Sequence, residues 1–177
     1  NKNISFIDYA NLKIPNKDLL DFYIVSKSTF VITTQTGFDA VPKIYNKKIL
    51  QISTPLLHAE TYYKNNLILT RRVRNKITKR TLSLKKTLKL NKYINGSHIY
   101  PERYLKNIYE TEIINKDVLV NSIKEIIIKK KQKKINKIEK KFWKIFNQYS
   151  YNAPLYHKTI KASFSNSFLL KYKNWLN

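Results

Sequence analysis

The feature that most constrains the fold is a strand-turn-helix-strand pattern in the first third of the chain. Residues 29–34 form a β-branched and aromatic run of strand length. Gln35-Thr36-Gly37 interrupts this run, and residues 38–45 then carry apolar side chains at helical spacing. Residues 49–53 form a second apolar run. Such a βαβ unit implies parallel strands, and together with a helical pattern just before it the sequence predicts an α/β fold.

The turn between the first strand and the helix is a candidate anion site. Ligands of parallel α/β sheets bind outside the carboxyl ends of the strands, which is where Gln35, Thr36 and Gly37 lie. The turn also precedes a helix N-terminus, where free N–H groups and the helix dipole favour a negative charge. We therefore predict ligand contacts from these three residues and from Phe38. An ordinary turn in which glycine supplies an unusual φ explains the same residues and stays open as an alternative.

Arginines follow the next apolar run along the chain. Residues 66–70 read as another strand, and Arg71, Arg72 and Arg74 come directly after it. Guanidinium groups bind phosphate oxygens in a bidentate manner, so Arg71 or Arg72 would assist a phosphate site at the same edge of the sheet. A basic surface loop in a basic protein is the plainer explanation, and the sequence favours it.

The charge of the chain is strongly positive. Lys+Arg number 35 against 11 Asp+Glu, a formal net charge of +24, which by itself points to nucleic acid or an anionic membrane surface. The run from Lys129 to Lys134 fits either partner. However, Lys, Asn, Ile, Tyr and Phe are all abundant and all have AT-rich codons, so a base bias of the genome would enrich them together. Solvated lysines without a partner therefore remain an alternative.

Several classes of site are excluded or unsupported. The chain has no cysteine, which excludes disulfides, thiolate catalysis and zinc-thiolate centres. Its three histidines, His58, His98 and His157, are isolated from one another, and no Asp-x-Asp pair occurs. We therefore predict no metal and no cofactor. No apolar stretch is long enough to cross a membrane, and a chain that starts at Asn1 and lacks Met is expected to be a piece of a longer protein.

Two regions are expected. Residues 1–115 should form an α/β domain, and residues 116–177 a helical segment that packs on it. Expected elements beyond the βαβ unit are a short helix at 81–88, a strand at 113–115, a helical stretch over 117–149 and a terminal helix over 163–176. The lysine run interrupts the apolar stripe of the stretch over 117–149, so either a solvated helix or a break between two helices is expected there.

The chain resembles a family of bacterial glycosyltransferases with a GT-B-like fold that act in surface-polysaccharide synthesis. The resemblance is carried by Ile7-Asp8-Tyr9-Ala10, Asp21-Phe22-Tyr23-Ile24, Phe30-Val31-Ile32-Thr33-Thr34-Gln35-Thr36-Gly37 and Tyr45-Asn46-Lys47-Lys48, and more weakly by Leu82-Ser83-Leu84, Ile114-Asn115, Ser167-Phe168-Leu169 and Asn174-Trp175-Leu176. Thr36-Gly37 stands where the family has Ser-Gly or Thr-Gly. The large excess of lysine departs from the family.

The resemblance implies a Rossmann-like, three-layer domain that is the C-terminal, donor-binding half of such an enzyme. Its substrate would be a nucleotide-diphosphate sugar, and its acceptor a glycan or a lipid-linked glycan. The general base would then lie in the other half, so no catalytic residue is assigned in this chain. The location implied is the cytoplasm, at the inner face of the cell membrane. Nucleic-acid binding without catalysis is the alternative function.

Overall fold

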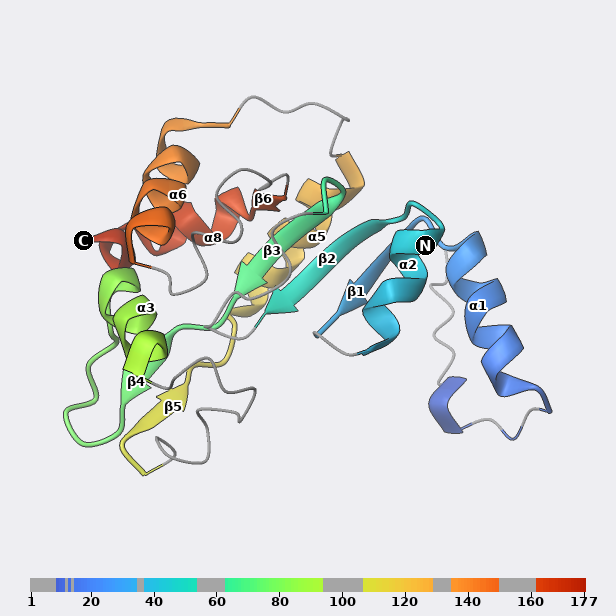
Figure 1. Cartoon of the computed structure of the whole chain (residues 1–177), viewed down its shortest axis with the longest axis horizontal. Helices are drawn as coiled ribbons and strands as arrows, with labels where there is room; N and C mark the ends of the chain where they lie inside the picture. Colours follow the sequence, from blue (N-terminus) through green and yellow to red (C-terminus); the bar gives the residue numbers. More distant parts are fainter. Residues whose placement is uncertain are drawn as a thin grey trace.

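The computed structural model describes residues 9–11, 13, 15–34, 37–53, 63–93, 107–128, 135–149 and 162–177 (Figure 1). Its α-helices are α1 (Lys17–Lys27), α2 (Ala40–Ile44), α3 (Leu84–Tyr93), α5 (Lys116–Ile128), α6 (Lys137–Tyr149) and α8 (Asn166–Lys171). Its strands are β1 (Phe30–Thr33), β2 (Lys48–Ser53), β3 (Asn66–Thr70), β4 (Val73–Asn75), β5 (Tyr109–Thr111) and β6 (Ser163–Phe164). Three 3₁₀ turns, η1 (Tyr9–Asn11), η2 (Gly37–Asp39) and η4 (Lys173–Leu176), complete the described elements.

A parallel sheet of four strands lies at the centre, in the order β1-β2-β3-β6. Val31 pairs with Ile49 and Thr33 with Gln51, so the two strands of the predicted βαβ unit are parallel. Ser53 is in register with Thr70 at the carboxyl ends of β2 and β3. The prediction of an α/β fold with a parallel sheet is confirmed.

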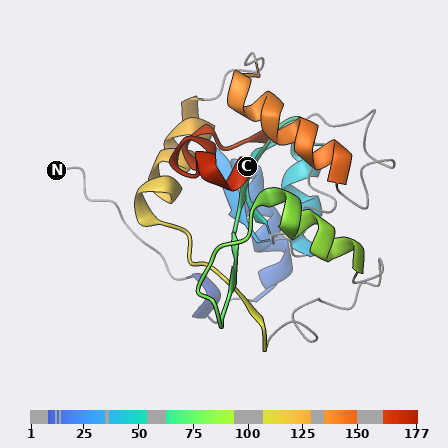
Figure 2. The same cartoon turned by 90° about the vertical axis from the view of Figure 1, so that its left-hand side faces the viewer.

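Helices cover both faces of the sheet. Figure 2, which views the molecule along its long axis, shows α5 and α8 on one side of the sheet and α2, α3 and α6 on the other. The ammonium group of Lys48 on β2 donates a hydrogen bond of 2.8 Å to the carbonyl of Ile127, which ties the sheet to the end of α5. The result is a three-layer arrangement in which one edge of the sheet, at β1, has no neighbouring strand among the described residues.

The hydrophobic core lies toward the β6 edge. Phe142 and Phe146 on α6 are completely buried, as amphipathic spacing on that helix requires. The ring of Phe142 lies 4.1 Å from that of Phe164 on β6, centre to centre. Phe168 of α8 and Trp175 of η4 close the same cluster, with their ring centres 5.3 Å apart. Burial of these large rings is the main favourable term that holds the C-terminal segment on the sheet.

The segment 116–177 also supplies the fourth strand, β6, which pairs with β3. The predicted terminal helix over 163–176 is therefore wrong at its start. Ser163 and Phe164 are extended, Ser165 caps α8, and the helix gives way to η4 at Lys173. Of the two arrangements expected within 117–149, the structure shows the break: α5 ends at Ile128, residues 135–136 are not helical, and α6 begins at Lys137.

A small antiparallel ribbon, β4 with β5, lies below the carboxyl end of β3 (Figure 1). The predicted strand at 113–115 is wrong: Ile113 is 95% exposed, and the strand occurs at Tyr109–Thr111 instead. Arg74 pairs with Glu110 across the ribbon at 2.7 Å, so the strand lies where the two strands pair in register and not at the isoleucines. Within the described part of the chain, no helix has the length and apolar character that a membrane span requires.

Candidate functional site

Four of the residues that the sequence singles out, Gly37, Phe38, Arg71 and Arg72, follow strands at the carboxyl edge of the sheet. β1 ends at Thr33, β3 ends at Thr70, and the loop after β1 leads into η2 and α2. In parallel α/β sheets this edge is where ligands bind, because loops there can vary while the strands hold their positions. The edge therefore defines the candidate site.

The predicted loop is only partly described. Gln35 and Thr36 lie outside the described residues, so nothing is said of their structure. Gly37 and Phe38 form the start of η2, and both are exposed. Gly37 does not adopt the left-handed conformation, and a β-carbon placed on it would meet no atom within 4 Å. The backbone at Gly37 is thus open to approach, and the glycine is not required there by its φ angle.

A chain of buried polar side chains lies directly behind this loop. Asp39, at the end of η2, accepts a short hydrogen bond from the Thr33 hydroxyl and a second one of 3.0 Å from the Gln51 amide. Gln51 in turn accepts from the Asn66 amide at 2.6 Å. Asp39, Gln51 and Asn66 are all buried. We call these four residues, Thr33, Asp39, Gln51 and Asn66, the polar ladder.

The polar ladder fixes the loop to the sheet. The bond from Thr33 to Asp39 closes the loop at its base, and Gln51 and Asn66 carry the connection across β2 and β3. Buried polar groups are costly unless they are hydrogen-bonded, so this arrangement holds Asp39 and the end of η2 in one position on the sheet. Asp39 makes no side-chain cap to α2, which leaves the first N–H groups of that turn unused by this carboxylate. The outcome is that Asp39, at the end of η2, is fixed to the sheet, while the backbone at Gly37 is open to approach.

Sequence reasoning missed the polar ladder. The detectable signal was Gln51, a polar residue in the middle of the apolar run Lys48-Ile49-Leu50-Gln51-Ile52. A buried amide in a central strand must find partners, and Asp39 lies twelve residues before it, beyond the reach of any local pattern.

The two candidate arginines differ in their surroundings. Arg71 follows β3 directly and is exposed. Arg72 forms an ion pair with Glu112, and its guanidinium lies over the ring of Tyr172 at 3.7 Å. Such a paired and stacked guanidinium is held in place by the protein itself. Of the two, Arg71 is therefore the one whose side chain is available to a ligand at this edge.

A second strand-to-helix turn, from β6 into α8, is already filled. The carboxylate of Glu125 on α5 accepts from the backbone N–H groups of Asn166 at 2.9 Å and Ser167 at 2.7 Å. Ser165 caps the same helix by accepting from the N–H of Phe168. This internal carboxylate occupies the position that an external anion would need, so the β1 loop remains the candidate.

Among the described residues, no group of three or more His, Asp or Glu side chains is placed to hold a metal ion. Comparison of the chain with protein-family models, with curated proteins and with solved structures found no match.

Proposed function

We propose that the chain is the donor-binding half of a glycosyltransferase with a GT-B-like fold, and that the loop after β1 binds the diphosphate of a nucleotide-diphosphate sugar. Backbone N–H groups of Gln35, Thr36, Gly37 and Phe38 would stabilise the leaving diphosphate, and Arg71, after β3 at the same edge of the sheet, would assist. The sugar would pass to a hydroxyl of a glycan or lipid-linked acceptor held by another part of the enzyme. No metal ion and no cofactor is assigned to this step.

One observation carries the proposal: a loop at the carboxyl edge of a parallel sheet, closed at its base by the bond from Thr33 to Asp39. Stabilisation of a leaving group depends on donors that are already in position before the reaction. In support of this, the polar ladder fixes the end of η2 to the sheet at Asp39, and the backbone at Gly37 lies in open space.

The proposal is tested by a substitution that blocks the ligand without disturbing the fold. Gly37→Val places its β-carbon in open space, whereas a phosphate close to this backbone would collide with the new side chain. We expect the dissociation constant of the preferred sugar nucleotide, measured by calorimetry with a panel of UDP-, GDP- and CMP-sugars, to rise on the order of tenfold or more. Ala40→Val, at an exposed position of the adjacent helix turn, is the matched control and should bind as the unaltered protein does.

Two results would contradict the proposal. If the Gly37→Val variant binds a sugar nucleotide as tightly as the unaltered protein, the ligand does not bind at this loop. The second result is that no sugar nucleotide of the panel binds, whereas RNA binds with an affinity that falls steeply as salt rises and is the same in Gly37→Val. That result would support the alternative of a basic nucleic-acid-binding domain.

A further inference from the structure

Two neighbouring helices share one unusual pattern. On α6, Glu139, Phe142, Trp143 and Phe146 are buried, and the opposite side carries Lys137, Lys140, Lys141 and Lys144, all exposed. On α3, Leu84, Thr87 and Leu88 are buried, and Lys85, Lys86 and Lys89 are exposed. The two helices pack against each other, and Figure 2 shows them lying side by side at the C-terminal end. We call these seven exposed lysines the lysine face.

Acidic side chains that would balance this charge lie elsewhere. Five of the described carboxylates are engaged inside the fold: Asp39 in the polar ladder, Glu110 and Glu112 with arginines, Glu125 at α8, and Glu139 with the N–H groups of Phe164 and Trp143. Among the described residues, no aspartate or glutamate side chain lies on the exposed side of α3 or α6. Helix surfaces ordinarily mix both signs, so this face is unusually one-signed.

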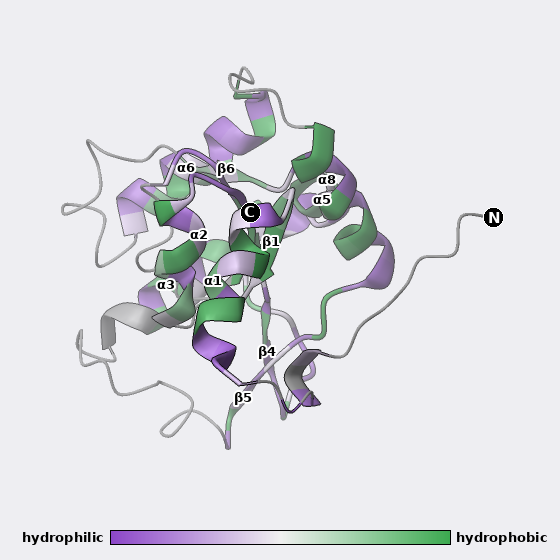
Figure 3. Cartoon of the chain, turned by 90° about the vertical axis from the view of Figure 1, so that its right-hand side faces the viewer, coloured by the Kyte–Doolittle hydropathy of each residue, from purple (hydrophilic) through white to green (hydrophobic). Residues whose placement is uncertain are grey.

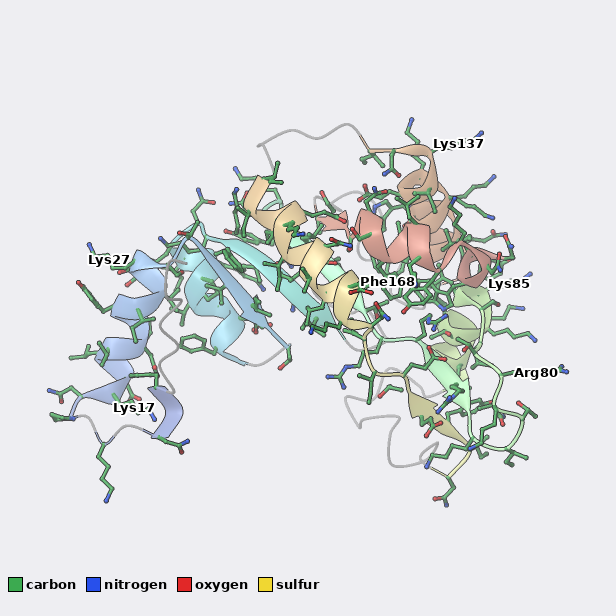
Figure 4. All side chains as sticks on the ribbon, turned by 180° about the vertical axis from the view of Figure 1, so that it is seen from behind. Lys17, Lys27, Arg80, Lys85, Lys137 and Phe168 are labelled. Carbon is green, nitrogen blue, oxygen red and sulfur yellow. The ribbon has the colours of Figure 1, made fainter. Side chains whose placement is uncertain are left out.

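The lysines of this face also repel one another, which costs free energy. Lys85 and Lys89 are four residues apart, as are Lys140 and Lys144, and like charges at this spacing repel each other along a helix. Part of that charge is held against an aromatic ring, because the ammonium groups of Lys85 and Lys89 lie 4.8 and 5.6 Å from the ring centre of Tyr149. Figure 4 shows Lys85 and Lys137 extending away from the molecule, from different helices at the same end. A negatively charged partner would relieve the repulsion.

We propose that the lysine face docks the protein on an anionic membrane surface. The face presents ammonium groups spread over two helices, and each lysine close to an anionic bilayer strengthens binding roughly fivefold. A fluid bilayer can place a headgroup under every lysine, so no matched geometry is needed. Docking of this kind is peripheral and reversible, and it does not depend on the donor site proposed above.

Composition of the face favours a bilayer over nucleic acid. Proteins that read or stack on nucleic acid use arginine, amide and aromatic side chains as well as lysine. Among the described side chains of α3 and α6 there is no arginine, and none of the aromatic rings is exposed. Phe142, Trp143 and Phe146 are buried, and Tyr149 lies beneath two lysines.

The test is flotation of the 177-residue chain with vesicles. Vesicles of phosphatidylcholine alone should leave it in solution, and vesicles that also contain phosphatidylglycerol should carry it upward at low salt but not at high salt. The triple variant Lys86→Gln, Lys140→Gln, Lys144→Gln removes lysines that make no described side-chain contact. We expect it to weaken the partition coefficient on the order of 100-fold.

A matched triple variant separates this surface from total charge. Lys13→Gln, Lys116→Gln and Lys124→Gln remove the same charge from exposed positions outside α3 and α6, and binding should change only a few-fold. Equal loss in both triple variants would overturn the assignment to the lysine face. The chain could also fail to bind anionic vesicles and instead bind duplex RNA through the same three lysines. That result would show that the partner is a nucleic acid and that the membrane proposal is wrong.

Discussion

The two ends of the sheet differ in how deeply their apolar side chains are buried. At the β1 end, α1 fully buries only Val25, while Leu19 is 72% exposed and Tyr23 is 59% exposed. Figure 3 views this end and shows hydrophobic residues on the outer surface of α1. At the β6 end the large rings, such as Phe142 and Phe168, are buried, and the outer surface is lysine.

This difference suggests separate roles: the β6 end carries the hydrophobic core that stabilises the fold, and the β1 end carries the candidate binding loop. The continuous core cluster draws its buried members from β2 onward and includes none from α1 or α2. Segments with few buried contacts have low local stability, and ligand-binding loops are commonly drawn from them. The loop after β1 belongs to the weakly packed end, yet the polar ladder ties it to β2 and β3. Hydrogen bonds hold Asp39, behind the candidate site, on the sheet, and aromatic packing at the far end stabilises the fold.

Phenylalanine substitutions at the two ends should give the largest contrast. Phe142→Ala removes a completely buried ring and should cost about 3–5 kcal/mol of unfolding free energy, because a cavity remains. Phe22→Ala on α1 removes a ring that is 41% exposed and should cost less than about 1 kcal/mol. Urea denaturation followed by circular dichroism measures both. Similar losses would mean that the β1 end is as well packed in solution as the β6 end.

Carboxylates at the two ends should give a smaller contrast. Glu139 accepts hydrogen bonds from the N–H of Phe164 at 2.7 Å and from the Trp143 indole at 3.4 Å. Glu139→Ala leaves both donors buried without this acceptor and should cost about 2–3 kcal/mol. Asp18 is exposed in the first turn of α1, where its negative charge interacts favourably with the positive end of the helix dipole. Asp18→Ala should therefore cost under about 1 kcal/mol.

The same denaturation measurement compares the two carboxylate variants, and Glu139→Gln is the control. A glutamine keeps a carbonyl that can accept one of the two bonds, so its loss should lie between those of Glu139→Ala and Asp18→Ala. If Glu139→Gln costs as much as Glu139→Ala, the negative charge itself, rather than the acceptor, stabilises this position.

Local patterns predicted the first half of the sheet well. β-branched residues before Gly37 and apolar residues from Ile49 to Ser53 correspond to β1 and β2, because a βαβ unit is built from neighbouring segments. Apolar spacing likewise identified α5 and α6, and the lysine run between them indicated a solvated helix or a break, of which the structure shows the break. In these segments a residue's neighbours in sequence are also its neighbours in space.

Long-range partners account for what the sequence did not reveal. Ser163 and Phe164 form a strand only because β3 lies beside them, and their own residue pattern continues a helix. Glu110 and Glu112 mark β5 only once Arg74 and Arg72 face them. The polar ladder joins four separate positions in the chain, and the filled N-terminus of α8 depends on Glu125 from another helix. Each of these contacts joins residues that are far apart in the sequence, so the spacing of residues within one segment cannot reveal it.

The smallest effect is expected from an exposed carboxylate beside the well-packed end. A hydrogen bond from Arg74 lowers the pKa of Glu110 below its ordinary value of 4.5. The unfolded chain therefore binds more protons at this position in the acidic range, so the contribution of Glu110 is fully present above pH 4.5 and is lost as pH falls through the lowered pKa. Arg74→Gln should raise the pKa of Glu110, as measured by carboxyl chemical shifts against pH. Arg80→Gln, at an exposed position in the segment that follows β4, should leave it unchanged. A Glu110 pKa that is the same in the unaltered protein and in Arg74→Gln would show that this exposed pair does not persist in solution, in contrast to the buried contacts of Glu139.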